Sequence, residues 1–148
     1  MDRFRGSAPA RLDEKGRLKV PNLFRQQIEE AFGRDLFVTS IHGRNFLLYP
    51  LPVWQTLEEK LAELPSIHRA KNKFLERVNY FGQDASIDAQ GRVLIPQILR
   101  DAAKLPADVV VTGNIDHLVV SDRGGLAKKL ATEDFAPEDY DELSKLLL

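Results

Sequence analysis

Two arginines stand in the same local setting and could do the same chemistry. Arg17 and Arg92 each follow a glycine directly and an aspartate by four residues, in the pattern D-x-x-G-R. A guanidinium carries five N–H donors in a rigid fork, which suits phosphate oxygens or the edge of a guanine base. The alternative is an ion pair with the preceding aspartate, Asp13 or Asp88, that only stabilises the fold. We therefore treat both arginines as candidate nucleic-acid contacts.

The residues around these arginines are those of a tight turn followed by a helix start. An aspartate opens the turn, and the glycine three residues later can take the positive φ of a type I turn with a bulge. A proline then ends the next strand and suits the first position of a helix. The residues expected to shape the backbone, without contacting a ligand, are Asp13, Gly16, Pro21, Asp88, Gly91 and Pro96.

The two settings belong to an internal repeat. Residues 10–25 align with residues 85–100 at a constant offset of 75, and six of the sixteen aligned pairs are identical. Half of the other ten pairs are apolar in both copies, as Leu18 and Val93 are. Such matching indicates a duplication. Each half is predicted to follow the order β-β-α-β-β, because alternating apolar residues surround the turn and Phe24, Ile28 and Phe32 then recur at helical spacing.

The remaining elements follow from the same patterns. We expect strands at 36–41 and 46–49 in the first half, and at 109–112 and 118–121 in the second half, where residues 113–117 form the loop. Two amphipathic helices should connect the halves. The first begins at Pro50 and carries Trp54, and the second is capped by Ser66. The predicted parts are a first half at 4–50, connecting helices at 51–80, a second half at 81–123 and an acidic C-terminal tail at 124–148.

Charge is distributed unevenly along the chain. The formal net charge is −1, yet residues 1–25 sum to +4 and residues 133–148 to −5. A basic start and an acidic end that cancel in the total point to a nucleic-acid surface plus a separate tail. From about Thr132 this tail is either mobile or a short docking helix, and the sequence leaves both possibilities open.

The sequence offers little for catalysis. It contains no cysteine, so disulfides and thiolate metal sites are excluded, and a reducing compartment is expected. His42, His68 and His117 lie in separate segments without metal-ligand or nucleophile spacing. Trp54 is interpreted as a core residue, although a base-stacking platform is the alternative. We expect no enzyme, no cofactor, no metal and, without an apolar run near ~20 residues, a cytoplasmic protein.

Four segments in this order resemble the MraZ family. They are residues 4–6 (FRG), 12–21 (LDEKGRLKVP), 48–52 (LYPLP) followed by Trp54, and 87–96 (IDAQGRVLIP). The resemblance covers roughly residues 4–122. It implies a mainly β fold with short helices, in which two pseudo-symmetric halves of the SpoVT–AbrB type form a tandem swapped-hairpin β-barrel. It further implies a ring-like homo-oligomer that binds direct repeats in promoter DNA at the nucleoid and controls the cell-division and cell-wall gene cluster, including its own promoter.

The candidate DNA contacts are ranked by their charge and position. Arg17 comes first, and Arg92 follows because Gln90 stands where the first half has a lysine. The expected DNA-binding residues are Arg17, Lys15, Arg92, Arg5, Lys19 and Arg11. For the lysines, Arg5 and Arg11, a solvated charged face is the alternative. Two other functions stay open, namely an antitoxin-like binding module of the AbrB type and a ring-forming structural protein.

Overall fold

The computed structural model describes residues 3–148. Asp2, which enters the charge of the N-terminal segment, lies outside the described residues. The first half contains β1 (Ser7–Arg11), β2 (Arg17–Lys19), α1 (Asn22–Ala31), β3 (Asp35–Thr39) and β4 (Phe46–Pro50). The connecting helices are α2 (Leu51–Ala62) and α3 (Arg69–Phe81). The second half contains β5 (Gln83–Ser86), β6 (Arg92–Leu94), α4 (Gln97–Ala103), β7 (Asp108–Asn114) and β8 (His117–Asp122), and the chain ends with α5 (Arg123–Thr132) and α6 (Pro137–Leu147).

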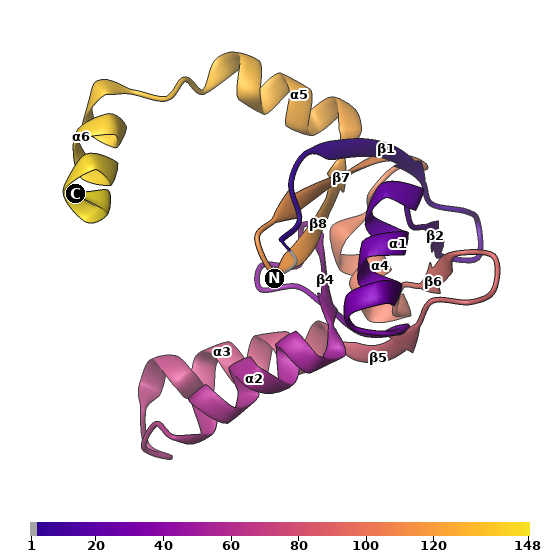
Figure 1. The fold of residues 1–148 in the computed structure, drawn as a ribbon, viewed down its shortest axis with the longest axis horizontal. Coiled ribbons are helices and arrows are strands. Elements are labelled where there is room, and N and C mark those ends of the chain that lie inside the picture. The colour runs from indigo at the N-terminus through magenta and orange to yellow at the C-terminus, as the bar shows by residue number, and fades with distance from the viewer. Residues whose placement is uncertain (1–2) are drawn as a thin grey trace.

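The two halves exchange strands. Six strands form one sheet in the order β1-β7-β8-β4-β3-β5, so each half places its first strand beside the third strand of the other half. The second strands, β2 and β6, pair only with each other in a separate antiparallel ladder. Figure 1 shows this ladder on one side of the molecule, beside α1 and α4. The order of the large sheet reads the same when the halves are interchanged, as expected for a duplicated unit.

The sheet is not closed into the barrel that the resemblance implied. In the described residues the edge strands β1 and β5 do not pair with each other. The chain turns after each of them into β2 or β6, and these two strands use their backbone groups for each other. Helices also hold more residues than strands, so the fold is a mixed β-sheet with short helices and not mainly β. Four of the helices lie outside the repeated units, where the repeat pattern gave no guidance.

One hydrophobic core serves both halves. Leu18, Phe24 and Ile28 of the first half share it with Val93 and Leu99 of the second half, and all five are fully buried or nearly so. Phe4 closes the core next to Phe24, with an edge-to-face contact at 6.3 Å between ring centroids. The predicted apolar stripe of the first helix is confirmed, since Phe32 also packs against this cluster. A unit of ~70 residues is marginal alone, and the shared core removes that difficulty.

The helix starts differ slightly from the expectation. Pro21 and Pro96 occupy the N-cap positions, with φ near −55° and extended ψ, so the helices begin one residue later. Their amide nitrogens have no hydrogen to leave unpaired at this position.

The predicted cap of the second connecting helix is wrong. His68 replaces Ser66 there, because its Nδ1 accepts a hydrogen bond of 3.2 Å from the backbone N–H of Lys71.

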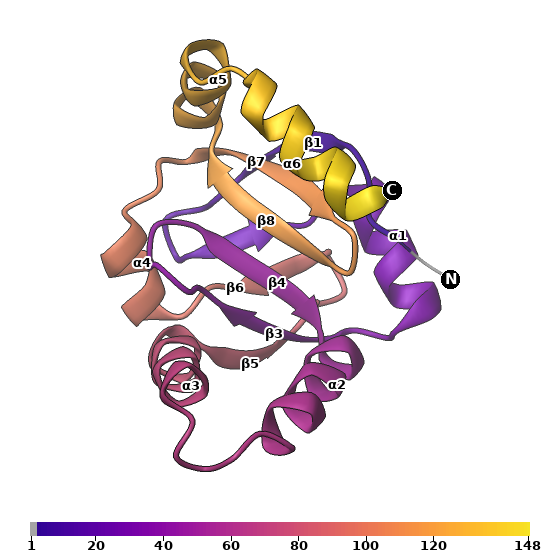
Figure 2. The ribbon, with the colours of Figure 1, turned by 90° about the vertical axis from the view of Figure 1, so that its left-hand side faces the viewer.

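The connecting helices leave the sheet after β4 and return before β5, as a pair that projects from it in Figure 1 and lies below the sheet in Figure 2. Trp54 is buried and stacks on Phe37 at 4.6 Å between ring centroids, with Tyr49 and Phe74 also in contact. Its interpretation as a core residue is therefore confirmed.

The loop expected at 113–117 is wrong, because β7 and β8 pair as far as Asn114 and His117.

The C-terminal stretch is helical. α5 lies against β7 and β8, whereas every apolar side chain of α6 is exposed. The stretch from about Thr132 thus contains a short helix, and its apolar side chains are not docked within residues 3–148. No helix between residues 3 and 148 has the length and apolar character that crossing a membrane requires.

Candidate nucleic-acid interface

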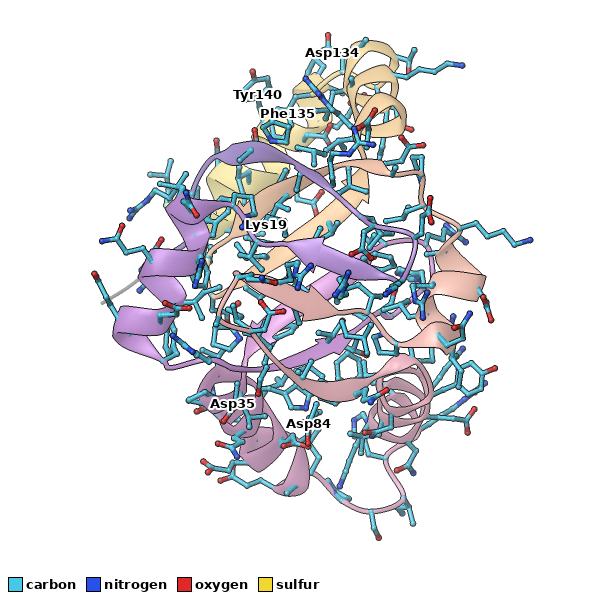
Figure 3. All side chains as sticks on the ribbon, turned by 90° about the vertical axis from the view of Figure 1, so that its right-hand side faces the viewer. Lys19, Asp35, Asp84, Asp134, Phe135 and Tyr140 are labelled. Atoms are coloured by element: carbon cyan, nitrogen blue, oxygen red, sulfur yellow. The ribbon has the colours of Figure 1, made fainter. Side chains whose placement is uncertain are left out.

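The β2–β6 ladder has one buried face and one exposed face. Leu18, Val20, Val93 and Ile95 point into the core. The alternate residues therefore point outward, and the register places Lys19 opposite Arg92 and Arg17 opposite Leu94. We call these four residues the ladder face. Three of them are cations from both halves of the chain, gathered on a strip that Figure 3 views directly, with Lys19 labelled.

The first turn is held by the carboxylate of Asp13. Its Oδ1 accepts hydrogen bonds from the backbone N–H groups of Lys15 (2.9 Å) and Arg17 (2.8 Å), and its Oδ2 accepts one from Arg17 Nε at 2.8 Å. The bond from the Arg17 backbone, aided by the guanidinium, lowers the pKa of Asp13. Gly16 has a φ of +82°, in the left-handed region that favours glycine.

This ion pair orients Arg17 and still leaves part of it available. Within residues 3–148 no hydrogen bond or ion pair involves the two Nη atoms of Arg17. Its side chain is 33% exposed. A guanidinium fixed at Nε can present both Nη groups together to phosphate or a base edge. The fold-stabilising pair and the ligand contact are thus compatible, so the two alternatives raised by the sequence do not exclude each other.

The second turn repeats the backbone bonds of the first, but its arginine is held differently. Asp88 Oδ1 accepts from the backbone N–H groups of Gln90 and Arg92 at 2.9 Å each, and the Arg92 bond is the main cause of the lowered pKa of Asp88. Gly91 has a φ of +80°. Gln90, however, accepts a hydrogen bond from Arg92 Nη2 through its side-chain oxygen. Arg92 Nε is buried without a hydrogen-bond partner and lies 3.4 Å from Asp88 Oδ2. Arg92 therefore presents fewer free Nη hydrogens than Arg17.

The two turns are tied to each other across the ladder. Lys19 Nζ donates to the backbone carbonyl of Gln90 at 2.7 Å, so one of its three protons serves the structure. The Val20 N–H donates to Gly91 O at 2.9 Å, and the Ile95 N–H donates to Gly16 O at 2.8 Å. These reciprocal bonds fix both turns relative to the ladder face.

The remaining predicted contacts are divided between two places. Lys15 is exposed at the tip of the first turn, and it lines a surface hollow with Arg11 and Arg17. Arg11 is exposed and forms an ion pair of 3.2 Å with Asp108. Arg5 precedes β1 at its other end, beside Gly113, and lies six residues or roughly 20 Å of extended chain from Arg11. The structure therefore groups five of the six candidates and separates Arg5.

Sequence reasoning gave no role to Arg25 and Arg100, although the repeat matches them. Each arginine belongs to the helix of one half and packs over the turn glycine of the other half. A Cβ on Gly16 would lie 2.3 Å from Arg100 Nε, and a Cβ on Gly91 would lie 2.7 Å from Arg25 Nη1. Arg25 Nη2 also donates to Ala89 O at 3.2 Å. Their identity in both halves was the signal that could have revealed this support.

The three histidines occupy separate structural positions. His68 caps α3, and His42 lines a hollow beside that helix. The ring of His117 stacks on Tyr49 at 4.3 Å between centroids, and its Nδ1 lies 2.7 Å from an Asp116 oxygen. No three His, Asp or Glu side chains in the described chain cluster as a metal site would require.

Comparison with known proteins agrees with the repeated architecture. The profile of the family described as "MraZ protein, putative antitoxin-like" matches residues 4–77 and 83–132. A protein of Acidobacterium capsulatum named Transcriptional regulator MraZ is 45% identical over 96% of this chain and 97% of its own length. Proteins of the same name from Koribacter versatilis (44%; 97% and 98%) and Citrobacter koseri (37%; 80% and 79%) are also similar. The chain therefore belongs to the MraZ family.

Proposed function

We propose that this protein is a transcriptional regulator that binds double-stranded DNA through the ladder face and the first turn. The observation that carries the proposal is the gathering of Arg17, Lys19 and Arg92 on one exposed strip, next to Lys15. Cations so placed can contact phosphates, and the free Nη groups of Arg17 can also read a guanine edge. The names of the relatives support regulation of transcription as the outcome.

The net charge of the chain does not oppose this proposal. DNA-binding affinity depends on cations that contact phosphates more than on total charge. The acidic helix α6 lies on the side of the molecule away from the ladder face in Figure 1. Its carboxylates are therefore separated from the proposed contact surface.

A single ladder face is expected to bind weakly, because it offers few phosphate contacts. We propose that several chains assemble into a ring and present their ladder faces to direct repeats in a promoter. Linked sites gain affinity without new contacts if the DNA can reach them. The exposed Leu23 and Ile98, equivalent residues on the first turns of α1 and α4, support self-association, since exposed apolar residues favour interfaces. Light scattering should give a mass well above twice 16.8 kDa.

The proposed targets are promoters of the cell-division and cell-wall gene cluster, including that of the protein's own gene. Binding there would place the protein in the cytoplasm, at the nucleoid. The family resemblance supports this assignment. Footprinting on the DNA upstream of the gene should show protection of short, regularly spaced repeats.

The decisive test is the Arg17→Ala variant in a gel shift on that upstream DNA. Loss of one bidentate contact costs about 1–3 kcal/mol per site, and a ring repeats the loss at each site. Arg92→Ala should weaken binding less, because Gln90 already occupies one of its Nη groups. Circular dichroism and light scattering must first show an unchanged fold and mass. Unchanged binding by a folded Arg17→Ala oligomer would overturn the ladder face as the contact surface.

A further inference from the structure

Helix α6 carries an apolar stripe that stays exposed in the described chain. Tyr140, Leu143, Leu146 and Leu147 recur at helical spacing and form what we call the α6 stripe. Leu146 is 77% exposed and Leu147 is 74% exposed. Four exposed apolar side chains on one face of an eleven-residue helix are costly in water, and they indicate a surface that becomes covered.

The α6 stripe has an acidic border. Phe135 contacts the Tyr140 ring edge-to-face at 4.6 Å, and Figure 3 shows both rings together near Asp134. Asp139 Oδ2 accepts a hydrogen bond from the backbone N–H of Ala136 and caps the helix. Glu142 lies beside Leu143 and Leu146 around a shallow hollow and makes no hydrogen bond or ion pair within residues 3–148.

A complementary surface lies on α3. Two adjoining hollows of about 450 and 480 Å³ share Ala70 and Lys73, and together we call them the α3 groove. Apolar atoms of Ile41, Ala70 and Phe74 line it. Its border is cationic, formed by Arg69, Lys73 and Arg77 with His42.

The cations of this border are available for a partner. In the described part of the chain, Arg69 and Lys73 take part in no hydrogen bond or ion pair. Arg77 donates to the carbonyl of Ile41 through Nε, which holds it at the edge of the groove. An apolar floor with a positive border matches an apolar helix face with a negative border.

We propose that the α6 stripe of one copy docks into the α3 groove of a second copy of this chain. The stripe is a helix face and the other surface is a groove, both are apolar, and their borders carry opposite charges. Each surface is uncovered in the single chain. The contact joins two different surfaces, so it is heterologous and can continue from copy to copy or close into a ring. It does not depend on DNA, because both surfaces lie away from the ladder face (Figure 1).

The helix and the groove of the same chain are poorly placed to meet. In Figure 1, α6 lies above and α3 below without meeting, and in Figure 2 the strands β8, β4 and β3 run between them. α5 is held against β7 and β8, and only residues 133–136 separate it from α6. A second copy is therefore the better occupant.

The proposal can be tested by disulfide trapping, because the native chain contains no cysteine. Leu146→Cys in one tagged chain is co-expressed with Ala70→Cys in a chain with a different tag, and the purified protein is oxidised without DNA. Ser144→Cys with Ala70→Cys is the matched control, since residue 144 projects about 160° away from residue 146 around the helix. Circular dichroism compares the fold of all variants.

We expect a covalent heterodimer with Leu146→Cys and its loss with Ser144→Cys. Equal trapping from both positions overturns the docking mode. Combining Leu146→Cys and Ala70→Cys in one chain tests the alternative that α6 docks into the α3 groove of its own chain. Trapping only within that chain overturns the proposal. A failure of DNA binding would leave these results unchanged, so the docking and the proposed function are tested separately.

Charge reversal provides a second measurement that a folding defect cannot imitate. Lys73→Glu in the Ala70→Cys chain, or Glu142→Lys in the Leu146→Cys chain, should each lower the yield of heterodimer because like charges then face each other. Both changes together should restore the yield. If the combined variant is trapped less than either single variant, the charged borders do not face each other.

Discussion

Leu18 pairs directly with Val93 across the β2–β6 ladder, and the two residues are equivalents in the internal repeat, 75 positions apart. A local two-fold axis of the duplication must therefore pass through this pair. Both side chains are buried in the shared core. The ladder is thus the seam at which the two halves meet, and the same seam presents the ladder face outward.

Leu18→Ala should destabilise both halves in one cooperative transition. Removing a buried leucine from a packed core costs about 2–5 kcal/mol, because a cavity remains. Denaturant unfolding followed by circular dichroism measures the change. Leu94→Ala is the matched control on the opposite side of the same ladder, where Leu94 is 53% exposed, and it should change stability by about 0.5 kcal/mol or less. Separate transitions for the two halves would contradict the shared core.

Gly16→Ala should lose stability for two separable reasons. Its φ of +82° strains any residue with a Cβ, at a cost of about 1–2 kcal/mol. The new Cβ would also displace the Arg100 side chain, whose Nε donates to Ile95 O at 3.0 Å.

A double-mutant cycle separates these two causes. In an Arg100→Ala background, Gly16→Ala should cost only the backbone strain. Gly33→Ala is a useful comparison, since its φ is +90° and a Cβ there meets nothing within 4 Å. Strict additivity of Gly16→Ala and Arg100→Ala in unfolding free energy would show that the glycine–arginine contact carries no energy.

Repeat matching predicted the order of the elements well, but it could not predict strand partners. The predicted tight turn is present in each half, with Asp13 N–H donating to Arg17 O and Asp88 N–H donating to Arg92 O, both at 2.9 Å. Beyond the turn, β1 pairs with β7 and β2 with β6. Alternation of apolar residues specifies which face of a strand is buried, not which strand lies beside it. The exchange between halves is therefore a tertiary property.

The candidate site was predictable only in part for a similar reason. The positions of Arg17 and Arg92 beside their turns follow from local sequence, because the aspartate and glycine act within five residues. The placement of Lys19 opposite Arg92 depends on ladder register between segments more than 70 residues apart. The Lys19 bond to Gln90 and the packing of Arg100 over Gly16 depend on the same long-range register.

Acid should loosen both turns. Hydrogen bonds from the backbone N–H of Arg17 and of Arg92 lower the pKa values of Asp13 and Asp88 below the ordinary 3.8. A lowered folded-state pKa stabilises the fold above the unfolded-state pKa, and this stabilisation is lost as the pH falls through the folded-state value. Thermal unfolding from pH 6 downward should therefore show the loss beginning at about pH 4 to 5.

The matched variants identify the groups responsible. Asp13→Asn with Asp88→Asn should lower the melting temperature at neutral pH and flatten its decline in acid. Glu14→Gln removes a neighbouring carboxylate that makes no hydrogen bond in the described residues, and it should leave the decline in place. A double Asn variant with the acid profile of the native protein would contradict this assignment.

Gln90→Lys should strengthen DNA binding by making the second turn resemble the first. The substitution adds a cation at the equivalent of Lys15, and it removes the side-chain oxygen that engages Arg92 Nη2. The backbone bonds of residue 90 to Asp88 and Lys19 remain possible, so the turn should keep its shape. Each added phosphate contact steepens the slope of log K against log salt by about 0.9. Compared with the native protein, the affinity of the variant should be raised most at low salt and should fall more steeply as the salt concentration increases.

Gln55→Lys, on the exposed side of α2 away from the ladder face, adds the same charge as a control. An equal effect of both lysines would mean that only net charge matters and that the second turn does not contact DNA.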